Sequence, residues 1–102
     1  MAQLERWIEA KVPVVCSVSW YLLHGQELQK DENGHLIVLV GFTKEGDPIF
    51  NDPGDRKQIR KTYKRSDFEA AWNYSKRTVY LIYPETHAIP EPANDEWLAR
   101  IR

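Results

Sequence analysis

The sequence predicts a small α+β domain, an antiparallel sheet of about five strands with roughly two or three short flanking helices. Short runs of apolar and β-branched residues alternate with turn residues along most of the chain, as is typical of strands. Other stretches repeat apolar residues at helical spacing. The chain has 102 residues, of which 42% are hydrophobic and 28% charged, and these values suit one globular domain.

The chain is expected to begin with a helix and a strand. Leu4, Trp7 and Ile8 recur at helical spacing between charged residues and predict a short amphipathic helix over residues 2–11. A proline then ends the helix. The stretch PVVCSVSWYL, residues 13–22, is rich in β-branched and aromatic residues and predicts a strand.

A long loop and a hairpin are expected next. Residues 24–34 are polar and show no period, which indicates a loop. The run HLIVLVGF, residues 35–42, lacks polar alternation and predicts a central strand buried on both faces. Gly46 in the following KEGD suits the positive φ of a turn, so PIFN, residues 48–51, is expected to return as a short strand.

The second half of the chain predicts a strand, a helix and a strand. Residues 57–64, KQIRKTYK, alternate as a half-exposed strand does. Ser66 and Glu69 fit a capping box and predict a helix through SDFEAAWNY. Its apolar face consists of Phe68, Ala71 and Trp72. TVYLIYP, residues 78–84, is expected to be the last core strand.

The remaining residues, 85–102, form a proline-punctuated tail, for which we expect a short helix capped by Asn94. The longest apolar run, residues 36–40, is far shorter than the roughly 20 residues of a membrane helix, so no membrane segment is expected. The N-terminus also lacks the apolar core of a secretory leader. One thiol is compatible with either a cytoplasmic or an exported protein.

A histidine opens the central strand and an aspartate follows the next strand, and these are the first candidates for chemistry. If the hairpin turns near Gly46, side-chain alternation points His35 and Asp52 to the same side of the sheet. A tight turn leaves Asp52 opposite Leu39 and too far from His35, since each residue adds about 3.3 Å. A wider loop, or a bulge at Gly46, brings the two side chains together.

Two interpretations of this pair follow from the residues. If the side chains meet, the carboxylate accepts a hydrogen bond from one ring nitrogen and fixes the tautomer, so the other nitrogen can serve as a base. If they do not meet, His35 only caps its strand, and Asp52 only begins a turn in NDPG.

Other polar and aromatic residues are weaker candidates. Trp20 is either a packing residue or the wall of a substrate groove, and His24 either decorates the long loop or lines the same groove. Cys16 is the only cysteine and lies within an expected strand, where a thiol behaves as a small core residue. The three histidines are widely spaced and no glycine-rich phosphate loop is present, so we expect neither a metal site nor a cofactor.

At the level of families, NGHLIVLVGF followed by IFNDP resembles the His and Asp motifs of papain-fold cysteine peptidases. The resemblance is to the peptidase C-39-like branch, which is related to the bacteriocin-processing peptidases. ERWIEAKVPVVCSVSW resembles the helix and strand that lead into the histidine there, and KTYKRSDFEAAW and TVYLIYP resemble its closing elements. The resemblance covers most of residues 3–84, in the family's order.

The resemblance implies the β half of a papain-like fold, with His35 as general base, Asp52 as the residue that orients it, and a peptide or protein as substrate. The family's nucleophilic cysteine lies well upstream on a helix, for which there is no room before Ala2. We therefore expect residues 1–84 to be the C-terminal subdomain of the catalytic domain and the upstream cysteine-bearing half to be its partner. We expect the chain alone to be inactive, and to self-associate through the exposed sheet face.

Two other functions stay open at this point. One is a non-catalytic binding module on a papain-like β scaffold. The other is polyanion binding by RKQIRKTYKR, residues 56–65, which holds six Lys or Arg. With a net charge of -1, this basic run is better explained as the solvated side of an edge strand, and no nucleic-acid partner is expected.

Overall fold

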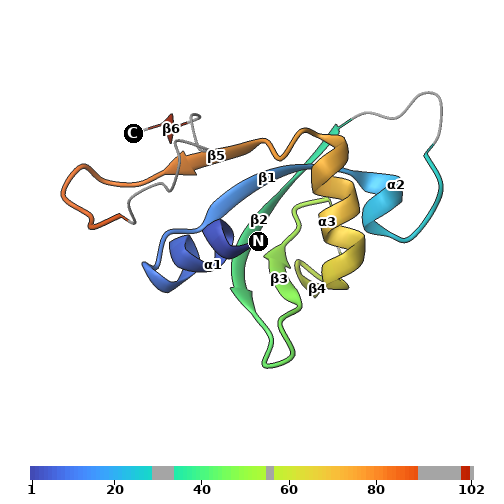
Figure 1. Cartoon of the computed structure of the whole chain (residues 1–102), viewed down its shortest axis with the longest axis horizontal. Coiled ribbons are helices and arrows are strands. Elements are labelled where there is room, and N and C mark those ends of the chain that lie inside the picture. Colours follow the sequence, from blue (N-terminus) through green and yellow to red (C-terminus); the bar gives the residue numbers. More distant parts are fainter. Residues whose placement is uncertain (29–33, 55–56, 90–99, 102) are drawn as a thin grey trace.

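The protein is one six-stranded sheet with three helices on one side, as seen in a computed structural model that describes residues 1–28, 34–54, 57–89 and 100–101 (Figure 1). Its elements are α1 (Ala2–Glu9), β1 (Val14–Ser19), α2 (Trp20–Leu23), β2 (Gly34–Phe42), β3 (Pro48–Asn51), β4 (Arg60–Thr62), α3 (Arg65–Tyr74), β5 (Val79–Ile82) and β6 (Arg100–Ile101). The strand order is β4-β3-β2-β1-β5-β6. Five strands pair antiparallel and β6 joins β5 in parallel, which confirms the predicted α+β class.

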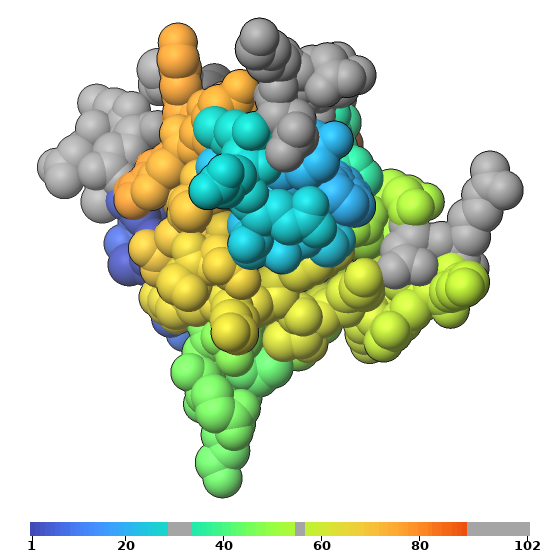
Figure 2. All heavy atoms as spheres, turned by 90° about the vertical axis from the view of Figure 1, so that its right-hand side faces the viewer, coloured from blue at the N-terminus to red at the C-terminus, as the bar shows by residue number. Residues whose placement is uncertain are grey.

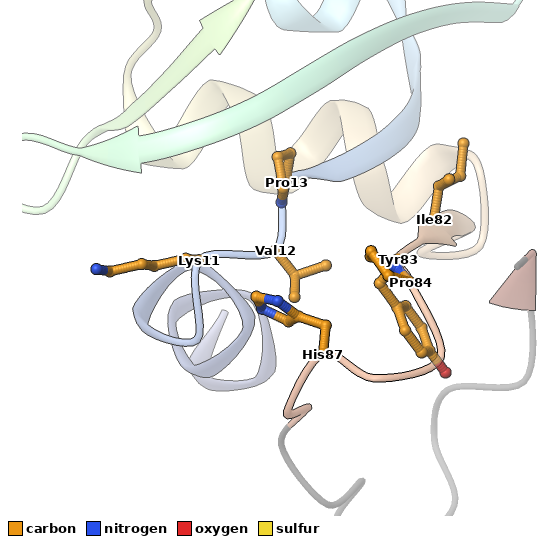
Figure 3. A pocket seen from close by; sticks show the side chains of 7 residues that line it. All are labelled: Lys11, Val12, Pro13, Ile82, Tyr83, Pro84 and His87. Atoms are coloured by element: carbon orange, nitrogen blue, oxygen red, sulfur yellow. The ribbon is translucent and has the colours of Figure 1, made fainter.

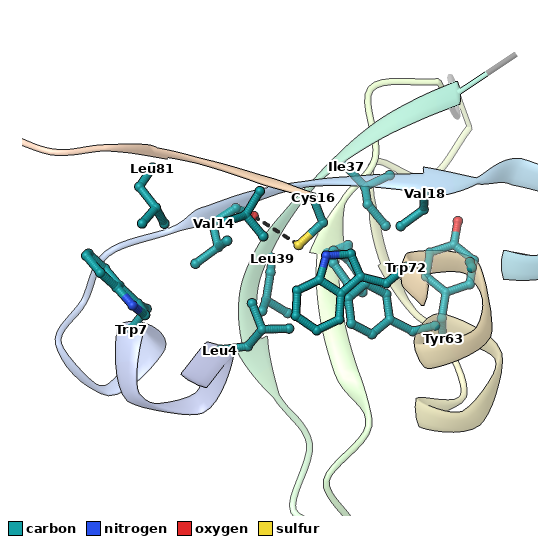
Figure 4. Packing of buried hydrophobic residues seen from close by; sticks show 14 of the residues in the cluster. Leu4, Trp7, Val14, Cys16, Val18, Ile37, Leu39, Tyr63, Trp72 and Leu81 are labelled. Carbon is teal, nitrogen blue, oxygen red and sulfur yellow. Dashed lines mark hydrogen bonds between the residues drawn. The ribbon is translucent and has the colours of Figure 1, made fainter. Parts of the chain in front are cut away.

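The core lies between the inner face of the sheet and the helices (Figure 4). Alternate residues of β1 and β2 point inward, as the period of a strand requires. Helix α1 contributes Leu4 and Trp7, and α3 contributes Phe68, Ala71 and Trp72, so both predicted helical faces are confirmed. The remaining fully buried side chains include Val14, Cys16, Val18, Ile37, Leu39, Phe50 and Leu81.

The prediction that β2 is buried on both faces is wrong. The strand is central, but only its inward residues are fully buried, whereas Leu36 on the outer face is 50% exposed. The three helices pack on the inner face, and among the described residues no helix covers the aliphatic side chains of the outer face. Tyr80, Val15 and Val38 are direct cross-strand neighbours in one outward row.

The predicted strand over residues 13–22 ends at Ser19. There the backbone turns into α2, because the Ser19 hydroxyl accepts a hydrogen bond from the backbone N–H of Leu22 at 3.2 Å. The β-branched and aromatic composition of this stretch favours a longer strand, but the N-cap at Ser19 begins α2 instead. As a result Trp20 and His24 lie on or beside a helix, not on a strand.

The predicted capping box of α3 is also wrong. The helix begins at Arg65, one residue before Ser66, and its first N–H donates to the carboxylate of Asp47 at 3.0 Å. Asp47 belongs to the β2–β3 turn, so the cap comes from a segment distant in sequence. The Arg65 guanidinium donates in return to the Gly46 carbonyl and to Glu5, both within 3.0 Å. Gly46 has the expected positive φ, and the turn projects beyond α3 as a spur (Figure 2).

The strand predicted over residues 57–64 is shorter than expected. Only β4 pairs with β3, at the edge of the sheet, and Tyr63 just beyond it is buried while Ile59 just before it is exposed. The helix expected after Asn94 falls on residues 90–99, outside the described part of the chain. The two described residues that follow form β6 instead.

We expect the outer sheet face to associate with a second copy of the chain at high concentration, because exposed apolar patches favour burial. Light scattering should then give a mass that rises above the monomer mass on concentration. Leu36→Glu should suppress this rise, whereas Ile59→Glu, which changes an exposed residue near β4, should not. A monomer at all concentrations contradicts the expectation.

Candidate functional site

The approach of Asp52 to His35 depends on two irregularities in the β2–β3 hairpin. First, the turn spans residues 43–47, which is wider than a tight turn, and the Thr43 and Asp47 backbones hydrogen bond across it at 2.8 Å. Second, the pairing shifts by one residue between Leu39 and Gly41. The two shifts carry Asp52 past Leu39, so that Val38 pairs with Asn51 and Asp52 comes next along the strand.

The two side chains are in hydrogen-bond contact. His35 Nε2 lies 2.8 Å from Asp52 Oδ1, with Asp52 3% exposed and the His35 side chain 21% exposed. An ionised carboxylate only accepts hydrogen bonds, so Nε2 carries the proton and donates it. The neutral ring therefore keeps its lone pair on Nδ1, and no residue within the described ranges hydrogen bonds to that nitrogen.

Asp52 accepts two further hydrogen bonds. The backbone N–H of Gly54 donates to Oδ1 at 2.9 Å, and the Tyr63 hydroxyl donates to Oδ2 at 2.9 Å. The bond from Gly54 forms the turn expected from NDPG, and Asp52 makes it at the same time as its bond to His35. Burial alone would raise the pKa of Asp52, but the bonds from His35, Tyr63 and Gly54 and the charge of His35 outweigh burial, and the pKa lies below its ordinary value.

Gly54 packs directly over the dyad. A Cβ at this position would lie 2.7 Å from His35 Cε1, closer than real Cβ contacts, and 3.2 Å from Asp52 Oδ1, which is a tight contact. The glycine is thus required for space and not for an unusual φ. The Gly54 backbone packs against the Cε1–Nε2 edge of the His35 ring.

His24 is linked to the dyad through Tyr63, and Trp20 is linked to it through His24. Their rings stack with centroids 4.1 Å apart, and His24 Nδ1 donates to the Trp20 carbonyl at 2.7 Å. The His24 ring then meets the edge of Tyr63, whose hydroxyl holds Asp52, at a centroid distance of 5.5 Å. Trp20 is 40% exposed. Their predicted place in a substrate groove stays a prediction.

Cys16 is a core residue. It is fully buried on β1, its thiol points at the Val14 carbonyl, 3.8 Å away, and burial raises its pKa far above the ordinary value (Figure 4). A neutral, inaccessible thiol is neither a nucleophile nor a metal ligand. Within the described ranges no three His, Cys, Asp or Glu side chains converge on a possible metal position. None of the helices in those ranges has the length and apolar character needed to span a membrane.

A small pocket lies apart from the dyad, between the end of α1 and the segment after β5 (Figure 3). Its volume of about 70 Å³ suits a few water molecules and not a peptide. His87 lines it and bonds through Nε2 to the Ala10 carbonyl at 2.8 Å, which ties the chain after β5 to α1. The other lining residues are Lys11, Val12, Pro13, Ile82, Tyr83 and Pro84.

Sequence reasoning missed Tyr63 and Gly54. The sequence places Tyr63 on a half-exposed strand, although alternation along residues 59–63 puts it on the same face as Phe50, which is the core face. Its bond to Asp52 joins residues 11 apart in sequence, and no pattern of residue types specifies that contact. Gly54 carried a weak signal, because Asp-Pro-Gly is a turn sequence in which glycine is common for several reasons.

The fold and the site together define an α+β domain in which a buried carboxylate orients a histidine at the start of a central strand, as in enzymes that activate a nucleophile. A model of the Peptidase_C39 like family matches residues 1–80, a range that contains the dyad, Gly54 and Tyr63. The chain belongs to this family, which confirms the resemblance of its motifs. No curated protein and no solved structure matches the chain.

We expect Gly54→Ala to displace the His35 ring, because the added methyl group overlaps Cε1. The exchange-protected Nε2–H proton of His35 should be observable by NMR in the unchanged protein and lost in the variant. Gly34→Ala is the control, since a Cβ there meets only Ser17 Oγ, at 3.9 Å. Retention of the Nε2–H signal in Gly54→Ala contradicts the packing described.

We expect Asp52 to make stability fall with acid. Its folded pKa is lowered, so its stabilising effect is complete above the ordinary Asp pKa of about 3.9 and is lost as pH falls through the lower folded value. Asp52→Asn should cost about 1–3 kcal/mol at pH 7, because it removes charged hydrogen bonds. Urea denaturation from pH 7 to pH 2 should show this difference shrink below about pH 4. A difference that is constant with pH would count against an ionised Asp52.

Proposed function

We propose that this chain supplies the general base and its orienting carboxylate for peptide-bond hydrolysis by a cysteine peptidase. The observation that carries the proposal is the bond from His35 Nε2 to the buried Asp52, which leaves Nδ1 as the basic nitrogen. Membership of the Peptidase_C39 like family supports it. A histidine fixed in this way on a rigid strand meets the geometric requirement for a base better than one on a loop.

The chemistry divides into acylation and deacylation. In the first step Nδ1 of His35 takes the proton of a thiol, the sulfur attacks the peptide carbonyl carbon, and a C–S bond forms. The C–N bond then breaks as the imidazolium returns that proton to the leaving amine. In the second step water attacks the thioester with His35 again as base, which releases the acid and restores the thiol. Asp52 holds the ring and stabilises its charged form throughout.

The nucleophile in this proposal comes from outside the 102 residues. The sequence holds one cysteine, and Cys16 is fully buried in the core. We propose that a cysteine-bearing half, upstream in the same protein, completes a papain-like catalytic domain whose C-terminal subdomain is residues 1–84, with residues 85–102 as its tail. Trp20 and His24 are proposed to line the groove that receives a peptide or protein substrate.

The test joins the chain to the segment that precedes it in the parent protein and follows hydrolysis of fluorogenic peptides. We expect thiol-dependent activity that the isolated chain lacks. His35→Ala should lower kcat by about 10²–10⁴, the usual contribution of a general base, and Asp52→Asn should lower it less.

Two variants serve as controls. His87→Ala removes a histidine that contacts α1 and not the dyad, and Cys16→Ala removes the buried thiol, so both should leave activity unchanged. Activity that survives His35→Ala, or that disappears with Cys16→Ala in a folded protein, is incompatible with the proposed roles.

A second candidate function is a non-catalytic peptide-binding module on the same scaffold. The observation that favours it is the absence of an accessible thiol from the sequence, whose one cysteine is buried. A parent protein without an upstream cysteine, together with peptide binding that is unchanged by His35→Ala, would support the module over the enzyme.

A further inference from the structure

We infer that Tyr63 is a positioning residue of the dyad, whose hydroxyl holds the second carboxylate oxygen of Asp52 so that the first stays on His35. This inference deepens the proposed function and rests on it for its catalytic meaning. Tyr63 follows the last residue of β4, and neither its place in the sequence nor the family match assigns it a role.

The carboxylate of Asp52 is held at both oxygens. Oδ1 accepts from His35 and Gly54, and Oδ2 accepts from Tyr63 at 2.9 Å in a fully buried contact. Without the hydroxyl, Oδ2 would be a buried charged atom that lacks its donor, which is costly. The carboxyl group would then rotate toward other donors or take up a proton. Either change removes a well-oriented acceptor from Nε2 of His35.

Three contacts of the Tyr63 backbone and ring hold its hydroxyl in place. The Tyr63 backbone N–H donates to the Pro48 carbonyl on β3 at 3.2 Å, which extends the β3–β4 pairing. On one side the ring meets His24 after α2, and on another it meets Phe50 of β3 at a centroid distance of 6.0 Å. The side chain is 8% exposed, so its ring has little freedom to turn. These contacts fix the hydroxyl before any substrate binds.

A role in packing alone predicts a different outcome from a role in positioning. If Tyr63 only packs, its replacement by phenylalanine keeps the ring contacts and changes little at Asp52. If the hydroxyl positions the carboxylate, the same replacement raises the pKa of Asp52, because one of the interactions that lower it is gone. Tyr63→Phe therefore separates the two roles without opening a cavity.

The first experiment uses the unchanged chain and NMR of labelled carboxyl and tyrosine carbons. As acid protonates Asp52, the Cζ resonance of Tyr63 should move with the same midpoint as the Cγ resonance of Asp52. The Cζ resonance of Tyr74, which is exposed on α3, should not. A Tyr63 resonance that does not follow Asp52 overturns the inference, and this measurement needs no variant to fold.

The second experiment compares Tyr63→Phe with Tyr80→Phe, a matched loss of a hydroxyl on the outer sheet face. We expect the Asp52 midpoint to rise by about 1 pH unit in the first, the effect of one hydrogen bond to a charged group, and to stay unchanged in the second. An unchanged Asp52 midpoint in a folded Tyr63→Phe protein overturns the inference.

In the protein joined to its cysteine-bearing segment, Tyr63→Phe should lower kcat about tenfold with little change in KM, because orientation of the base acts after binding. A rise in KM at constant kcat overturns the assigned role. Failure of the joined protein to hydrolyse peptides refutes the proposed function alone, since the NMR experiments test the link between Tyr63 and Asp52 without any turnover.

Discussion

The buried carboxylate of Asp52 is the constraint on which the rest of this structure depends. An ionised group that is removed from water is tolerated only if donors replace its hydration, and here the donors come from three separate places in the chain. His35 opens β2, Gly54 lies in the turn after β3, and Tyr63 follows β4. The hairpin register and the short edge strand therefore have a common role, because both are needed to bring these donors to one pair of oxygens.

Features set by neighbouring residues could be predicted from the sequence better than features set by distant segments. Most helices and strands, though not α2 or β6, follow from local periodicity, and the predicted inward faces of α1 and α3 are correct because their apolar residues repeat regularly. Features set by distant segments were missed: the cap of α3 by Asp47, the exposure of Leu36 on the outer face, and the contact of Tyr63 with Asp52. The candidate pair was found, but its contact depended on a bulge that residue types do not specify.

The two most reactive side-chain types of this chain lie in opposite environments. His35 lies at the rim of the core with no described partner on Nδ1, whereas the thiol of Cys16 is packed in the centre and kept neutral by burial. This difference is what the proposed division of the catalytic groups between two segments requires. Cys16 serves the core, and the dyad is held by its own polar contacts.

The turn between β2 and β3 limits which insertions and deletions this protein can tolerate. Asp47 and Thr43 bond to each other, and Asp47 is also bound to the first N–H of α3, so both ends of the turn are fixed. A slip of one residue moves every side chain of a strand to the opposite face, so a change of turn length that shifts the β2–β3 register would turn Asp52 away from the core. The length of this turn therefore constrains the site more than the identity of its exposed side chains does.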